Sequence, residues 1–273
     1  MSYRTPPEAR LEFAGVGSPL LAFSHATGFC KEVWKPSVAA VRAAEIRLPA
    51  VAWDYRCHGD APVVEGEFDW WMFAEDALSV VAGRGPVLGI GHSMGGAALV
   101  LAELAAPGTF AGLLLIEPII VPGPTVRWDN GPMAEGARRR RAVFPSRADA
   151  LDNYRGKGGF ATWTEESLEA YVDGGFRVQD DGSLTLKCRP DREAEVFAAS
   201  LTHGAFDRLG ELTCPVRIIA GEVTDTHPHA ILEQYLSVIP DSTVAMLPGT
   251  THFIPMERPD LVAGEIAGLL SRL

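Results

Sequence analysis

A serine flanked by two glycines stands in one short apolar stretch, Pro86 to Ala106. The residues before Ser93 form an apolar run of strand length, and those after it are small, apolar helix formers. A serine on a sharp strand-to-helix turn needs an unusual backbone angle, and a Cβ two positions away would clash, so Gly91 and Gly95 suit this turn. The turn would raise the hydroxyl above the sheet, where the amides of the following helix face any oxyanion formed there. The pattern therefore predicts a nucleophile elbow at Ser93.

A serine hydroxyl becomes a good nucleophile only when a base takes its proton and a carboxylate orients that base. Of the seven histidines, His252 alone follows the last predicted strand, and we expect it to be the base. His227 is instead expected to lie at the start of the next helix.

Three carboxylates compete for the role of the acid. Asp225 is preferred, because it lies just past the strand Val216–Ala220 and because the chain order serine, acid, histidine is typical of this arrangement. Glu117, which also ends a strand, is the second choice, and Glu222 is the third. For the oxyanion, the amide of Met94 and that of Thr27, in the loop after the second strand, are the expected donors.

Strands alternate with helices along most of the chain, which predicts an α/β fold with a mostly parallel central sheet covered by helices on both faces. The first two strands, 10–14 and 19–24, are expected to form a hairpin across the turn at 15–17. Further strands are expected at 50–53, 87–92, 112–116, 216–220 and 243–247, and helices at 32–44, 69–81, 94–106, 228–238 and 260–270.

Residues 120–201 break this alternation, with more charged and aromatic residues and a helical periodicity. The segment is too long for a connecting loop and is interpreted as a helical cap, or lid, inserted into a core made of 1–119 and 202–273. Its aromatic residues suit a partly apolar substrate, although for any single ring, packing between cap and core is the simpler explanation. The candidate pocket residues are Trp128, Phe144, Trp163 and His203.

The chain of 273 residues has a formal net charge of −11, which argues against nucleic acid or an anionic membrane as a partner. The sequence has no apolar run of membrane-spanning length and no signal-peptide core, and its four cysteines are scattered, so a cytoplasmic protein is expected. No phosphate loop, dinucleotide fingerprint or metal cluster is visible, so no cofactor and no metal are expected. The expected partner is a small-molecule substrate, and the oligomeric state stays open.

At these motifs the chain resembles the α/β-hydrolase superfamily, in its lid-bearing esterase, lipase and peptidase-like branch. The resemblance covers about two thirds of the chain and rests on His25-x-x-Gly28, Asp54-x-Arg56-x-His58-Gly59, Gly91-His92-Ser93-Met94-Gly95-Gly96, Gly221-x-x-x-Asp225 and Gly249-x-x-His252. The chain departs from the family in having Ala26 and Cys57 where glycine is usual. A serine at the elbow is unlike the aspartate of epoxide hydrolases and haloalkane dehalogenases.

The resemblance implies Ser93 as nucleophile, Asp225 as acid, His252 as base, and Thr27 and Met94 as oxyanion donors. The expected reaction is hydrolysis of a small carboxylic ester through an acyl-enzyme. Lactones, thioesters, amides and C–C bonds are alternative substrates for the same triad. A cofactor-free oxygenase and a non-catalytic small-molecule receptor are further alternatives on this fold, and fold analogy alone does not choose among them.

Overall fold

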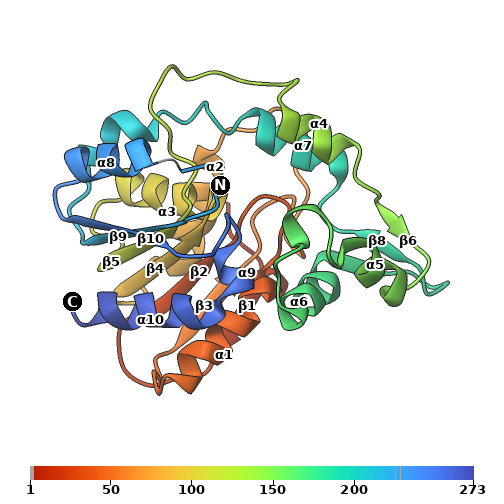
Figure 1. Ribbon diagram of the computed structural model, residues 1–273, viewed down its shortest axis with the longest axis horizontal. Helices are drawn as coiled ribbons and strands as arrows, with labels where there is room; N and C mark the ends of the chain where they lie inside the picture. The colour runs from red at the N-terminus through yellow and green to blue at the C-terminus, as the bar shows by residue number, and fades with distance from the viewer. Residues whose placement is uncertain (1–2, 225, 228) are drawn as a thin grey trace.

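A seven-stranded sheet forms the centre of the computed structural model, which describes residues 3–224, 226–227 and 229–273 (Figure 1). The strand order is β1-β3-β2-β4-β5-β9-β10. The strands are β1 (Arg10–Phe13), β2 (Leu20–Ser24), β3 (Ala50–Trp53), β4 (Val87–His92), β5 (Gly112–Ile116), β9 (Val216–Gly221) and β10 (Ser242–Leu247). Every neighbouring pair is parallel except β1 with β3, which confirms the mostly parallel sheet expected from the sequence.

The expected hairpin between the first two strands is wrong. Strand β1 pairs antiparallel with β3, with Arg10 opposite Trp53 and Phe13 opposite Ala50. Strand β2 is buried along its whole length and already has parallel neighbours on both edges, β3 and β4. The partly exposed β1 therefore takes the edge position beyond β3.

Helices cover both faces of the sheet (Figure 1). Residues of α2 (Trp71–Val81), α3 (Met94–Ala105) and α8 (His229–Val238) belong to one apolar core, and those of α1 (Lys35–Ala43) and α10 (Pro259–Leu270) to a second. The central strands β2, β4 and β5 are fully buried between these layers, which explains why they are continuous apolar runs. The short helix α9 (Ile254–Glu257) follows β10, and 3₁₀ helices lie at Pro7–Ala9, Lys31–Trp34, Gly158–Phe160 and Ala205–Glu211.

The segment between β5 and β9 contains helices and a second, small sheet. The helices are α4 (Pro132–Arg138), α5 (Arg147–Tyr154), α6 (Glu165–Gly175) and α7 (Pro190–Ala198). The strands β6 (Val143–Phe144), β7 (Phe176–Val178) and β8 (Leu184–Leu186) form an antiparallel sheet in the order β6-β8-β7. The sequence predicts a purely helical segment and misses these strands, because two or three residues are too few to display an alternating pattern.

Several polar contacts tie this segment to the loop between β3 and α2, and three of them involve buried or half-buried side chains of Trp70, Lys187 and Arg192. The indole Nε1 of Trp70 donates to the carbonyl of Val196 at 2.9 Å. The ammonium of Lys187 lies 2.6 Å from the Asp60 carboxylate, and Arg192 donates to the carbonyl of Gly66 at 2.7 Å. Helices α4 and α7 pack side by side and lie at the top of the molecule in Figure 1, beyond the ends of the strands.

The part of the chain that the structure describes contains no helix that is both long and apolar enough to cross a membrane. Its four cysteines, Cys30, Cys57, Cys188 and Cys214, are buried and unpaired. The cytoplasmic location expected from the sequence stays a prediction.

Candidate active site

The strained residue of the elbow is Ser93 itself, at φ 55° and ψ −117° between β4 and α3. The two flanking glycines, Gly91 and Gly95, allow neighbouring backbone segments to approach closely. A Cβ on Gly91 would lie 2.7 Å from the carbonyl oxygen of Gly95, and one on Gly95 would lie 2.3 Å from that of Ser24. Such strain persists in a folded protein only where the surroundings impose it, and it clusters at functional sites.

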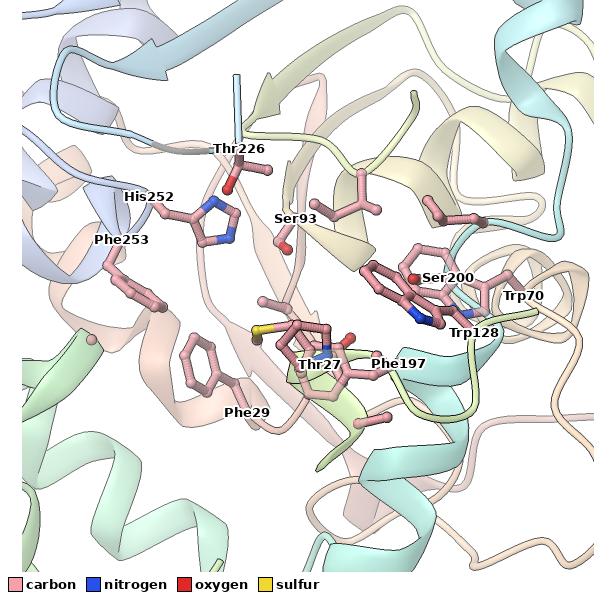
Figure 2. Close-up of a pocket in the computed structure, with 18 residues that line it drawn as sticks. Thr27, Phe29, Trp70, Ser93, Trp128, Phe197, Ser200, Thr226, His252 and Phe253 are labelled. Carbon is pink, nitrogen blue, oxygen red and sulfur yellow. The ribbon is translucent and has the colours of Figure 1, made fainter. Parts of the chain in front are cut away.

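The side chains of Ser93 and His252 line the same cavity. Figure 2 shows His252 and Phe253 on one side of Ser93, with Trp70, Trp128 and Phe197 on the other. Within the described residues no hydrogen bond joins the Ser93 hydroxyl to the His252 ring; such contacts are often long before a substrate binds. The structure thus brings the predicted nucleophile and the predicted base into one site.

The partner of His252 in the structure is Glu117, at the end of β5. The Nδ1 atom of His252 lies 3.1 Å from Oε2 of this carboxylate. Glu117 is fully buried, has a left-handed backbone (φ 51°), and also accepts hydrogen bonds from the amide of Gly221, the hydroxyl of Thr224 and Nδ1 of His227. Burial alone raises the pKa of the Glu117 carboxyl, but hydrogen bonds from His227 and His252 outweigh it and hold that pKa well below its usual range. The group is therefore a carboxylate at neutral pH.

Asp225, the preferred acid from the sequence, lies outside the described residues, and its role stays a prediction. The neighbouring Thr224 donates its hydroxyl to Glu117 at 3.0 Å. On the other side, Thr226 lines the cavity beside His252. In the described part of the chain, Glu117 is the carboxylate that contacts the base. Glu222, the third choice for the acid, instead accepts a hydrogen bond from the backbone amide of Gly249.

His92, the residue before the nucleophile, holds the backbone of His252. Its Nε2 donates to the His252 carbonyl at 2.9 Å. Burial, with the nearby His252 ring as a second cause, lowers the pKa of His92 to about 3, so this ring is neutral at physiological pH. A neutral imidazole carries one N–H, and here it is used to fix the loop that presents the base.

Two backbone amides are available for an oxyanion. Among the described residues, the amides of Thr27 and Met94 donate to no other group, and Thr27 lines the cavity beside Ser93. The loop that carries Thr27 is held by His25, whose Nδ1 donates to the carbonyl of Ala26 at 2.7 Å while its Nε2 accepts the amide of Tyr55 at 3.3 Å. Free amides on an anchored loop are what an oxyanion hole requires.

Gly28, next to Thr27, packs against the ion pair between Arg140 and Glu193, which belong to the segment between β5 and β9. Its φ is +79°, and a Cβ there would lie 2.3 Å from Oε1 of Glu193 and 3.1 Å from Nη1 of Arg140. We expect Gly28→Ala to lower kcat by about 10- to 100-fold, because the Thr27 amide would shift from its position. Measurement of kcat and KM on an activated ester checks this expectation.

The matched control for that variant is Gly83→Ala. Gly83 has a similar φ of +74°, but no heavy atom lies within 4 Å of the place where its Cβ would stand, so it shares the backbone strain without the collision. The control should lose thermal stability and keep its kcat. Wild-type kcat in a folded Gly28→Ala protein would contradict the role assigned to this close contact.

The cavity beside Ser93 has a volume of about 520 Å³ and an apolar lining. Its large side chains come from the loops after β2, β3 and β10 and from α4, α7 and their flanks: Phe29, Trp70, Trp128, Met133, Phe197 and Phe253. Among the described residues, no Lys, Arg, Asp or Glu side chain lines it. In the same part of the chain, no cluster of His, Cys, Asp or Glu is arranged to hold a metal ion.

Of the four pocket residues expected from the sequence, only Trp128 lines this cavity. Phe144 is fully buried and packs between Tyr154 and Phe176. The indole of Trp163 packs on Phe29 and Phe160, behind the cavity wall.

His203 is also absent from the cavity wall, because it stacks on Trp70 and hydrogen-bonds the carbonyl of Ile119 at 3.0 Å. The lining residues that the sequence did not indicate, Met133 and Phe197 among them, lie on the facing helices α4 and α7 and become neighbours only when those helices pack.

Comparison with known proteins agrees with this architecture. The model of the alpha/beta hydrolase family matches residues 21–265. The chain is 25% identical to the abhydrolase domain-containing protein AKT2 of Alternaria alternata over 222 residues, 68% of this chain and 84% of that protein. It is 21% identical to the 2-(acetamidomethylene)succinate hydrolase of Mesorhizobium japonicum over 254 residues, 92% of this chain and 88% of that protein. The structure of the peroxisomal alpha-beta-hydrolase Lpx1 from Saccharomyces cerevisiae superposes with a TM-score of 0.79 at 20% identity, covering 93% of this chain and 76% of that one. With its sheet, its elbow and a family match over most of its length, the chain belongs to the α/β-hydrolase family.

Proposed function

We propose that this protein is a serine hydrolase that cleaves a small, uncharged and partly apolar carboxylic ester through an acyl-enzyme on Ser93. The observation that carries the proposal is the convergence, on one cavity, of a strained serine and a histidine whose far nitrogen contacts a buried carboxylate. This set of groups supplies a nucleophile, a base and an orienting acid.

In the proposed reaction, Nε2 of His252 accepts the Ser93 proton as the hydroxyl oxygen attacks the ester carbonyl carbon. The amides of Thr27 and Met94 stabilise the resulting oxyanion. The Glu117 carboxylate keeps Nδ1 of His252 protonated and stabilises the imidazolium. His252 then gives its proton to the leaving alkoxide, and a water molecule, activated by the same imidazole, hydrolyses the acyl-enzyme.

The character of the cavity supports an uncharged substrate. A carboxylate-bearing substrate in an apolar cavity would need a cation as partner, because an unpaired buried charge costs several kcal/mol. The described lining has no such cation. The Mesorhizobium relative is named for a succinate derivative, which is a dicarboxylate, and the lining here favours a different, neutral ligand.

We also infer that residues 120–201 act as a cap over the active site. They supply Trp128, Met133 and Phe197 to the cavity wall and are tied to the core at Trp70. The fit between acyl group and enzyme then depends chiefly on α4, α7 and the chain between β5 and α4.

Trp128→Ala is expected to raise KM for an apolar ester by about 3- to 10-fold with little change in kcat, because the indole contacts substrate away from the reacting atoms. Steady-state kinetics on one ester check this expectation. Val178→Ala is the matched control, since Val178 is an exposed apolar residue of the same segment, and it lies outside the cavity wall. Equal KM values for the two variants would contradict the assignment of Trp128 to the substrate site.

The experiment that tests the proposed function is hydrolysis of 4-nitrophenyl acyl esters of increasing chain length, followed by release of nitrophenol. Turnover with a maximum at short or medium acyl chains is expected from a cavity of about 520 Å³. A panel of lactones, thioesters, amides and C–C substrates run alongside identifies a different scissile bond. Oxygen uptake, or tight ligand binding without turnover of any substrate, would contradict hydrolysis.

A further inference from the structure

Two histidines share the carboxylate of Glu117. Oε2 of this residue lies 2.8 Å from Nδ1 of His227 and 3.1 Å from Nδ1 of His252. His252 faces the cavity, whereas His227 is fully buried behind the carboxylate. The usual triad has one histidine on its acid, and the second one here has no role in the reaction as described.

Both ring nitrogens of His227 point at acceptors. While Nδ1 faces the Glu117 carboxylate, Nε2 lies 2.8 Å from the carbonyl oxygen of Pro118. A neutral imidazole has a single N–H and would leave one of these acceptors facing a lone pair. The nearby hydroxyl of Tyr235, 3.4 Å from Nε2, is already donated to the carbonyl of Ile120. Only the imidazolium form of His227 satisfies both contacts.

We propose that His227 is a cationic positioning residue that shares Glu117 with His252 and thereby sets the pH range in which His252 acts as a base. The inference rests on the proposed function, because it needs His252 to be the base and Glu117 its partner. His227 itself touches neither the cavity nor the reacting atoms.

The sign of the effect follows from the charges. A cation on the far side of the carboxylate disfavours a second cation at His252, so the His252 ring stays neutral, and active, to lower pH. Among the described residues, the other titratable groups that face this cluster are His92 from β4, which is neutral, and Tyr235 from α8. Burial raises the pKa of the Tyr235 hydroxyl above its usual range, so it also carries no charge at neutral pH. The balance in the described part of the cluster is therefore between Glu117, His227 and His252.

The test is the pH dependence of kcat/KM for His227→Gln. Glutamine keeps an N–H donor but carries no charge, so the pH of half-maximal kcat/KM on the acid side should move up by about one unit. His229→Gln, the same substitution at an exposed histidine two residues away, is the matched control and should give the wild-type profile. A merely structural role for His227 would lower kcat/KM at every pH and leave the acid limb where it was.

An acid limb of His227→Gln that coincides with that of the wild type, in a protein folded by circular dichroism, would overturn the inference. Nitrogen NMR of the wild-type protein with ¹⁵N-labelled histidine supplies a second measurement that needs no variant. It should show one buried histidine with both ring nitrogens protonated at pH 7, and a neutral ring at His227 would overturn the inference as well.

Ser93→Ala, assayed in parallel, distinguishes a failure of the proposed function from a failure of the inference about His227. If Ser93→Ala is as active as wild type, the proposed function fails. If it is inactive and the acid limb of His227→Gln is unmoved, only the present inference fails.

Discussion

Ser93→Ala is expected to lower kcat for ester hydrolysis by about 10⁴- to 10⁶-fold, leaving only the rate that the oxyanion hole and binding provide without a nucleophile. The variant removes one oxygen atom. In the described part of the structure that oxygen accepts and donates no hydrogen bond, so the melting temperature should change little. The loss of activity would therefore report on chemistry, and kcat with circular dichroism on the same sample measures both.

Ser237→Ala is the matched control, because Ser237 is an exposed serine of α8 whose hydroxyl donates to the carbonyl of Gln234, away from the cavity. It should keep full activity. A phosphonate ester that reacts with activated serines should label the wild type and the control at one site and leave Ser93→Ala unlabelled. Equal activity in Ser93→Ala and wild type would reject Ser93 as the nucleophile.

Glu117→Gln is expected to lower kcat by about 10²- to 10⁴-fold, because the amide no longer stabilises the imidazolium and can hold His252 in the wrong tautomer. The substitution also leaves His227 opposite a neutral group, so a lower melting temperature should accompany it. Glu117→Asp keeps the charge on a shorter side chain and should recover part of the activity. A partial recovery distinguishes the loss of the charge from general damage to the fold.

Asp225→Asn, measured in the same assay, decides between the two candidate acids. With Glu117 as the partner of His252, Asp225→Asn should show the smaller loss of the two amide variants. The reverse order would identify Asp225 as the acid and assign Glu117 to the support of the loop after β9, through its contacts with Gly221 and Thr224.

Much of the site depends on short stretches of sequence, and these were predictable. The elbow needs glycine at 91 and 95 because backbone atoms lie within 2.7 Å of where a Cβ would stand, and the sequence motif records this requirement directly. Strands β3, β4 and β5 begin and end at the predicted residues, because a buried parallel strand is an uninterrupted apolar run. The position of His252 after the last strand follows from the strand count alone.

Other features depend on contacts between distant segments, which no local pattern records. The pairing of β1 with β3 is decided by which strand edges remain free after the parallel sheet forms. The lining of the cavity depends on how α4 and α7 pack over the sheet, and so Phe144 and Trp163 point elsewhere.

The α/β architecture, the serine elbow and the candidate base could be predicted, because each is encoded in a run of neighbouring residues. Which carboxylate in the described part of the chain contacts that base depends instead on the packing of distant elements. Glu117, Asp225 and Glu222 all follow strands whose carboxyl ends meet at one edge of the sheet, so strand order leaves them equivalent. The contact of Glu117 with both His227 and His252 joins segments 110 and 135 residues apart in the chain. Such contacts arise from the packing of whole elements, and a hydrogen bond of about 3 Å is set by that packing rather than by the identity of neighbouring residues.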